Sequence, residues 1–282
     1  MTISTSETII GHSLEEYFLP IITLTTDFGQ KDGFAGVLKG VIWGICPEVQ
    51  IADITHGITP QNVMEAALAL QRAAPFFPGG AIHIAVVDPG VGTNRRPMAA
   101  RLGDHYFVGP DNGIFSPMIE EAQRRDWDSV FVQLDRAEYW LPEVSRTFHG
   151  RDVFAPVGAH LARGVNITDL GSRFNNPIML PLPRPVHTSS GWDAHITIVD
   201  TFGNITLDLR ADQVEAKDGV QFLIKGRRIN GMVESYGRWE RGELIALVDS
   251  EGFIEIAVVN GSAARDLQAA VGDTVQVLVQ QR

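Results

Sequence analysis

The chain has 282 residues, of which 44% are hydrophobic and 20% charged, as is usual for a globular protein large enough for one or two domains. Its formal net charge of -11 argues against nucleic acid or an anionic membrane as the main partner and favours a small cationic or zwitterionic ligand. The single cysteine, Cys46, excludes an intrachain disulfide and a cluster of thiolate metal ligands.

The first residues, Met1 to Glu16, are polar and acidic, and they lack the basic start and apolar core of a signal peptide. No apolar run approaches the roughly 20 residues that are needed to cross a bilayer. We therefore expect a cytoplasmic protein that does not bind membranes, with a flexible tail over residues 1–19.

Short apolar strands alternate with amphipathic helices through the first half of the chain. Strands are predicted at residues 21–25, 49–54, 81–87 and 130–134, with a hairpin over residues 98–108. Helices are predicted at residues 35–45, from an N-cap at Thr59 to about residue 74, and at 116–125 and 153–163. This alternation predicts an α/β domain over residues 20–185 with a central, mostly parallel sheet.

Four prolines between Pro177 and Pro185 predict a linker. Beyond it the pattern changes to short strand-like runs separated by Gly and Asp, at residues 195–200, 204–209, 220–224, 227–229, 243–248, 253–258 and 274–279. Little of this half has helical spacing. We expect a smaller all-β, barrel-like domain over residues 188–282.

The most informative stretch lies at the end of the third predicted strand. The apolar run ends in Asp88, a turn rich in Pro and Gly follows, and Arg95 comes seven residues after the acid. Loops at the carboxyl ends of strands are where α/β proteins bind ligands. Asp27 and Asn112 occupy similar loop positions, and His149 lies a few residues ahead of a predicted helix, a location suited to polar chemistry.

Each of these residues also has a structural interpretation. An Asp before Pro-Gly is often only a turn former, a His before a helix is often a capping residue, and Arg95 is also interpretable as a solvated charge. The chain contains no phosphate loop, nucleophile elbow or zinc-binding His-Glu-x-x-His motif. Asp27-Phe28-Gly29 matches a kinase tripeptide, but the other kinase motifs are missing.

Six motifs, taken together and in order, favour the functional interpretation. They are Asp27-Phe28-Gly29, Val87 to Arg95, Pro110 to Gly113, Phe148 to Pro156, Asp200 to Asn204, and Ser250 to Asn260. With these motifs the chain closely resembles the S-adenosyl-L-methionine (SAM) hydroxide adenosyltransferase family, which is related to the fluorinases and chlorinases. The resemblance extends from about Ile21 to the C-terminus.

The resemblance implies an enzyme that splits SAM with water into adenosine and L-methionine, without a cofactor or a metal. The hydrolytic triad of the family falls on Asp88, Arg95 and His149. The fluorinating relatives carry Tyr in place of Asp88, and Tyr-Ser in place of His149-Gly150. The acid and the imidazole therefore imply water chemistry rather than halide chemistry.

The resemblance also implies substrate contacts in the first domain. Asp27 is similar to the acid that accepts hydrogen bonds from both ribose hydroxyls, as a carboxylate can do with its two oxygens. Gln61 stands where the relatives have a Trp near the ribose, and Asn112 is expected among the substrate-binding residues.

Further contacts are implied in the second domain. Asp200 and Ser250 match residues that bind the methionine amino and carboxylate groups, although Glu251 stands where the halogenating relatives have Arg. The adenine-side contacts implied are Phe202, Asn204, the backbone near Asn260 and Gly261, and Tyr236 as a stacking residue.

The family assembles as a trimer, so the resemblance implies a homotrimer with the active site at the subunit interface. Two other functions stay open at this point. One is halide-dependent adenosyl transfer, and the other is a non-catalytic sensor of SAM or adenosine.

Overall fold

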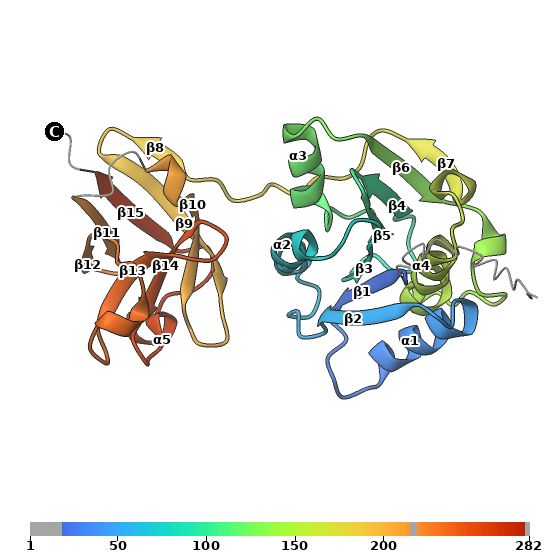
Figure 1. Ribbon diagram of the computed structural model, residues 1–282, viewed down its shortest axis with the longest axis horizontal. Coiled ribbons are helices and arrows are strands. Elements are labelled where there is room, and N and C mark those ends of the chain that lie inside the picture. Colours follow the sequence, from blue (N-terminus) through green and yellow to red (C-terminus); the bar gives the residue numbers. More distant parts are fainter. Residues whose placement is uncertain (1–18, 215–218, 280–282) are drawn as a thin grey trace, which may run out of the picture. The chain divides into compact units, whose positions relative to one another are not determined.

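The computed structural model describes residues 19–214 and 219–279, so that the expected N-terminal tail lies almost wholly outside the described residues. The chain divides into two compact units, Met1–Leu180 (unit 1) and Pro181–Arg282 (unit 2), which are described separately below (Figure 1). Within the described residues, no helix has the length and apolar character needed to cross a membrane.

Unit 1 is built on a seven-stranded sheet of order β2-β1-β3-β5-β4-β6-β7. Its strands are β1 (Ile21–Thr26), β2 (Gln50–Thr55), β3 (Ile82–Val86), β4 (Pro97–Leu102), β5 (His105–Pro110), β6 (Ser129–Leu134) and β7 (Gly171–Phe174). Parallel pairing joins β2, β1, β3 and β5, and antiparallel pairing joins β5, β4, β6 and β7. Only β4 and β7 therefore run against the other five strands, which confirms the expected α/β class with a mostly parallel sheet.

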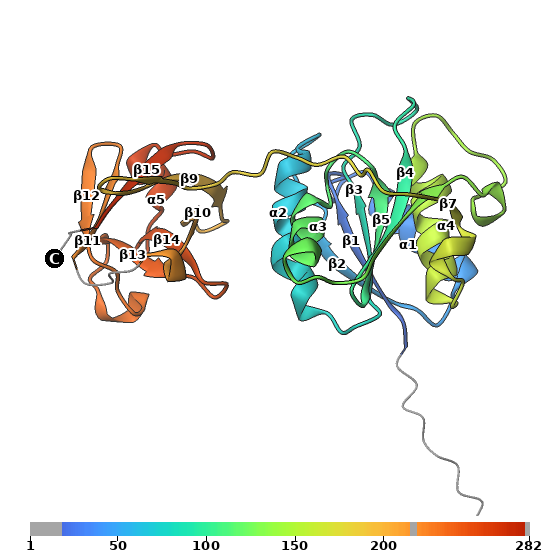
Figure 2. The same ribbon diagram turned by 90° about the horizontal axis from the view of Figure 1, so that it is seen from above.

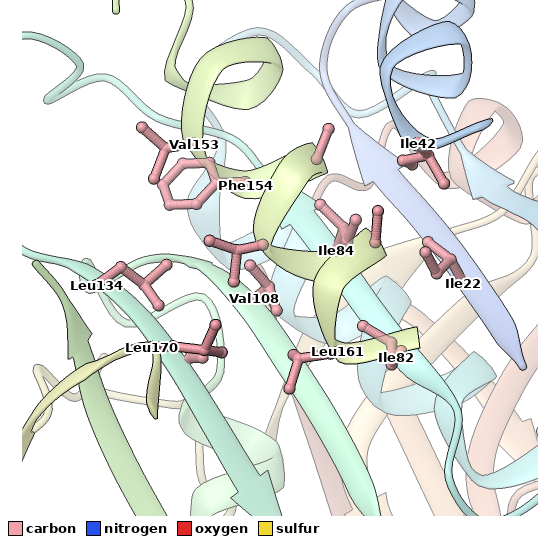
Figure 3. Close-up of a cluster of buried hydrophobic side chains, with 14 of the residues drawn as sticks. Ile22, Ile42, Ile82, Ile84, Val108, Leu134, Val153, Phe154, Leu161 and Leu170 are labelled. Carbon is pink, nitrogen blue, oxygen red and sulfur yellow. The ribbon is translucent and has the colours of Figure 1, made fainter. Parts of the chain in front are cut away.

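Helices cover both faces of this sheet, as Figure 2 shows for unit 1. The helices are α1 (Phe34–Ile45), α2 (Val63–Ala73), α3 (Ser116–Arg124) and α4 (Ala155–Ala162). Along β3 and the residue after it, the side chains alternate between two cores: Ile82 and Ile84 pack with α1 and α4, whereas Ala85 and Val87 pack with α2 and α3. Figure 3 shows the first of these cores, which also contains Phe154. Burial on both faces explains why β3 is almost wholly apolar.

The order of the strands places a reversal of the chain's winding between β1 and β3. The chain leaves β1 toward β2 on one side and then returns to β3 on the other side of β1, with α1 and α2 on opposite faces. The carboxyl ends of β1 and β3 therefore flank the point where the winding reverses, which is where open α/β sheets bind ligands. Asp27 directly follows β1, and Asp88 comes two residues after β3.

The predicted start of the second helix was wrong. Thr59-Pro60 has the composition of a helix start, but the helix begins at Val63, and Asn62 is the N-cap whose side chain accepts the N–H of Glu65 at 3.1 Å. The preceding Gln61 has a φ of 66°, so the chain turns sharply before the helix. The cap is therefore decided by a turn that local composition does not reveal.

Unit 2 is an antiparallel, barrel-like sheet, as expected. The strand order is β12-β11-β15-β9-β10-β14-β13, with β8 paired to β9. Its strands are β8 (Val186–Thr188), β9 (Gly191–Val199), β10 (Ile205–Arg210), β11 (Val220–Ile224), β12 (Arg227–Asn230), β13 (Leu244–Val248), β14 (Phe253–Val258) and β15 (Thr274–Val279). The end strands β12 and β13 also lie in contact, which nearly closes the barrel. A short helix, α5 (Ala263–Leu267), was not predicted.

Candidate active site

The structure brings Asp88, Arg95 and His149 together at the carboxyl edge of β3. Arg95 donates to both carboxylate oxygens of Asp88, from Nε to Oδ1 at 3.0 Å and from Nη2 to Oδ2. Nη2 also lies 3.0 Å from His149 Nδ1. The side chains of Arg95 and Asp88 are only 7% and 5% exposed. The guanidinium therefore joins a buried carboxylate to the half-buried imidazole of His149.

The hydrogen bonding fixes the tautomer of His149. Arg95 has only donors, so Nδ1 of His149 must accept, and Nε2 of the neutral ring carries the hydrogen. Partial burial lowers the pKa of the His149 imidazole below its ordinary value, and the adjacent Arg95 charge lowers it further, against the opposing effects of Asp88, Asp152 and the backbone of Ser145. We therefore assign a neutral His149 that presents Nε2–H as a donor.

One donor of Arg95 is left over. Nη1 is buried and has no hydrogen-bond partner among the described residues, although the guanidinium carbon lies 5.2 Å from the centre of the Phe154 ring. Buried donors are nearly always paired with protein or ordered water. Nη1 is therefore a donor that a water or ligand in the cluster could use.

Two loops must approach closely to form this cluster. Gly92, in the loop between Asp88 and Arg95, has a φ of 76°, and a Cβ there would lie 2.3 Å from the carbonyl oxygen of Arg146. Only glycine permits this approach, which brings the loop after β3 against the loop that carries His149.

The loop before His149 is fixed by Asp152, which is fully buried. Its carboxylate accepts the N–H of Ser145 at 2.8 Å and Nε of Arg151 at 2.6 Å. Ser145 Oγ in turn accepts the N–H of Phe148 at 3.0 Å. The buried carboxylate of Asp152 therefore fixes the loop that leads into His149. The π-helical turn Gly150–Phe154 then connects His149 to α4.

Asp27 lies in the loop after β1, at the same edge as the triad. Its Oδ2 accepts the N–H of Gln61 at 2.8 Å, so Gln61 meets Asp27 through its backbone. The ring of Phe28 packs edge-to-face on that of Phe148, with centroids 5.7 Å apart. This aromatic contact links the Asp27 loop to the loop of His149.

Asn112 uses both ends of its side-chain amide within the protein. Nδ2 donates to the carbonyl oxygen of Val87 at 2.9 Å, and Oδ1 accepts the N–H of Ile114 at 3.2 Å. The residue therefore ties the loop after β5 to the residue just before Asp88.

In unit 2, Asp200, Phe202 and Asn204 form the turn between β9 and β10. The Asp200 carboxylate accepts the N–H groups of Phe202 and Asn204 at 2.9 and 2.8 Å, and the Asn204 amide at 3.1 Å. These bonds project the Phe202 ring outward, where it is 77% exposed. The turn lies against the segment after Asn260 and Gly261, because the N–H of Ala264 donates to the carbonyl oxygen of Gly203 at 2.9 Å.

The other substrate-binding residues predicted in unit 2 lie farther apart from one another. Ser250 lies in the turn before β14 and Asn260 follows its end, so a six-residue strand of roughly 20 Å separates them. Between them, the Tyr236 hydroxyl donates to the buried carboxylate of Glu255. Burial and this hydrogen bond raise the pKa of the Tyr236 hydroxyl far above its usual range, so that the phenol stays protonated.

Asp152 and Glu255 were not among the predicted site residues, although both lie inside the motifs that carry the resemblance. Asp152 next to Arg151 has the pattern of a local surface ion pair, and only the fold reveals that it is buried against Ser145. The usable signal for Glu255 was an acid in an otherwise apolar strand, which requires a partner when buried. Within the described residues, no three His, Cys, Asp or Glu side chains are grouped as a metal ion would require.

An α/β unit with a hydrogen-bonded Asp-Arg-His cluster at its winding reversal, followed by an antiparallel β-unit, defines the class of protein. Models of the SAM hydroxide adenosyltransferase N-terminal and C-terminal domains match residues 22–171 and 194–276. The chain belongs to the SAM hydroxide adenosyltransferase family.

Individual relatives agree with this assignment. The chain is 37% identical to the (R)-S-adenosyl-L-methionine hydrolase of Salinispora tropica over 260 residues, which cover 92% of this chain and 97% of the relative. It is 24% identical to a fluorinase of an Actinoplanes species over 294 residues, covering 92% and 97% of the two chains. The crystal structure of an uncharacterized conserved protein from Thermotoga maritima has a TM-score of 0.85 at 35% identity and covers 92% of this chain and all of that one.

Proposed function

We propose that the protein hydrolyses SAM to adenosine and L-methionine. The observation that carries this proposal is the hydrogen-bonded cluster of Asp88, Arg95 and His149, with the first two side chains buried, at the strand edge where an α/β sheet binds ligands. The similarity to proteins named SAM hydrolases supports the same reaction. No separate cofactor is required, since the sulfonium of SAM is itself the leaving group.

In this reaction a water oxygen attacks C5′ of the ribose while the bond from C5′ to sulfur breaks. The electron pair of that bond stays on sulfur, and methionine departs as a neutral thioether. The water loses one proton, and adenosine retains the new C5′–O bond. Sulfonium and incipient hydroxide lose their charges together, so a poorly solvated site favours the transition state.

The three residues have different capacities for the proton. Arg95 has no lone pair to offer, and Nδ1 of His149 already accepts from Arg95. Each oxygen of Asp88 takes one hydrogen bond from Arg95 and keeps a further acceptor site. We therefore assign Asp88 as the proton acceptor, with His149 Nε2–H and Arg95 as donors that orient the water.

The remaining residues are assigned to substrate binding. Asp27 binds the ribose hydroxyls with Gln61 beside it, and Asn112 holds the residue before Asp88. Unit 2 supplies Asp200 and Ser250 for the methionine portion. The adenine side is assigned to Phe202, Asn204, Tyr236, Asn260 and Gly261.

Product analysis tests the reaction directly. Purified protein incubated with SAM should release adenosine and methionine in equal amounts, and Asp88→Ala and His149→Ala should abolish both. Binding of SAM without release of methionine would instead identify a sensor. Formation of 5′-chloro-5′-deoxyadenosine in place of adenosine when chloride is added would identify a halide-dependent adenosyltransferase like the fluorinase relatives.

The predicted assembly belongs to this proposal as well. We propose a cytoplasmic homotrimer with the active site at the subunit interface. Light scattering coupled to gel filtration should give a mass three times the 30.9 kDa of the chain, and a monomer mass would contradict the assembly without affecting the chemistry.

A further inference from the structure

A chain of polar side chains runs from the surface to the loop that follows β1. Lys39 Nζ donates to Asp53 Oδ2 at 2.6 Å, and Asp53 Oδ1 lies 3.1 Å from His56 Nε2. His56 Nδ1 lies 2.8 Å from Thr26 Oγ1, which also accepts the N–H of Phe28 at 3.2 Å. The proposed reaction does not use any of these four side chains, so this series of polar contacts needs another explanation.

His56 is the central member and holds both sides of Asp27. It lies just after β2 and is only 2% exposed. Its ring contacts Thr26, the residue before Asp27, while its carbonyl oxygen accepts the N–H of Gly29 at 2.7 Å. The short loop from Thr26 to Gly29 is thereby anchored at each end on one residue.

The donors and acceptors form a consistent sequence. A carboxylate only accepts, so His56 carries its hydrogen on Nε2, facing Asp53. That contact is electrostatic rather than a straight hydrogen bond, because among the described residues Nε2 has no acceptor with suitable geometry. Nδ1 then accepts the hydroxyl hydrogen of Thr26, whose oxygen remains free for the N–H of Phe28.

We propose that His56 is a positioning residue that fixes Asp27 for the ribose hydroxyls of the substrate. This inference rests on the proposed function. A bidentate hydrogen bond to two hydroxyls needs a carboxylate held in a single orientation, and the Gln61 N–H contacts only one of its oxygens. Burying an imidazole is costly unless its nitrogens are compensated, so packing alone would be served better by an apolar side chain.

Two amide substitutions distinguish the contribution of Nδ1 of His56 from that of Nε2. His56→Asn keeps a polar group near the position of Nδ1 and can retain the bond to Thr26, whereas His56→Gln reaches toward Asp53 and loses that bond. We expect His56→Gln to raise KM for SAM by roughly three- to tenfold, with a smaller change in kcat, and His56→Asn to restore much of the loss.

A substrate comparison separates positioning from general damage. For a SAM analogue that lacks both ribose hydroxyls, His56→Gln and the unmodified protein should have nearly equal KM values, since the contact that His56 supports is missing. A loss of the same size for both substrates would show that His56 only maintains the fold and would overturn the inference.

The sheet offers a matched control. Thr23 Oγ1 lies 2.8 Å from His83 Nδ1, a buried contact of the same type and length on the same strand, but away from the carboxyl edge. Both Thr26→Val and Thr23→Val should lower the melting temperature by a similar amount. Only Thr26→Val should raise KM for SAM.

The outcomes also distinguish this inference from the proposed function. If the unmodified protein releases adenosine from SAM but Thr26→Val and His56→Gln keep its KM, the inference is wrong and the proposed function stands. If the unmodified protein does not turn over SAM, both are wrong.

Discussion

Acidification is expected to destabilise unit 1 through His83, a histidine outside the active site. Its side chain is fully buried between Thr23, His105 and the ring of Phe107. Burial, with a smaller contribution from His105, lowers the pKa of the His83 imidazole from 6.5 to about 3. The native state therefore keeps His83 neutral at pH values where the unfolded chain protonates it.

The sign and size of the effect follow from this difference. Because the unfolded state binds the extra proton below pH 6.5, the free energy of unfolding falls as the pH decreases from 6.5 toward 3. Each pH unit in this window costs about 1.4 kcal/mol, so His83 should account for about 2 kcal/mol of lost stability between pH 7.5 and pH 5.

Urea unfolding at the two pH values measures this contribution when a variant without the titrating group is compared. The double substitution Thr23→Val and His83→Phe removes the imidazole together with the hydroxyl that contacts it, and keeps an aromatic ring beside Phe107. The loss of unfolding free energy between pH 7.5 and pH 5 should be about 2 kcal/mol smaller in the variant. An equal loss in both proteins would refute the reasoning.

Four further predictions concern the site. Asp88→Asn should lower kcat by at least roughly 100-fold and, by leaving the buried Arg95 charge unpaired, lower the unfolding free energy by about 3 kcal/mol in urea titrations. The pH profile of kcat/KM should lose activity on the acidic side only below pH 6.5, because the pKa of His149 is lowered, and a midpoint above 6.5 would contradict this. Asp152→Asn should lower kcat by roughly tenfold by releasing the loop before His149, and unchanged kinetics would show that the loop is held otherwise. Phe202→Ala should raise KM for SAM by about tenfold in steady-state assays without a change in melting temperature, since the ring is exposed.

Much of the fold was predictable because burial leaves a periodic pattern in the sequence. The almost wholly apolar run that became β3 indicated a strand covered on both faces, and the helices on either side confirm it. The strands β7 and β8 were missed because Gly171–Phe174 and Val186–Thr188 are short and show no alternation. β7 pairs with β6, which is distant in sequence, whereas β8 pairs with β9, the strand that directly follows it.

The site was predictable only through the set of motifs. Local sequence alone left Asp88 interpretable as a turn former, and it does lie in a turn, since its carbonyl oxygen accepts the N–H of Val91. The fold adds the contacts that local sequence cannot specify: Arg95 with His149, across 54 residues, and Thr26 with His56, across 30. A single histidine without a spacing pattern gave no reason to single out His56.

The central claim, that a water beside Asp88 attacks C5′ of SAM, is tested most directly by isotope labelling. Turnover in oxygen-18 water should place one labelled oxygen in the 5′-hydroxyl of adenosine and none in methionine, and both products should be missing with Asp88→Ala. Adenosine formed without label at the 5′ position, or label in the methionine carboxylate, would contradict the account.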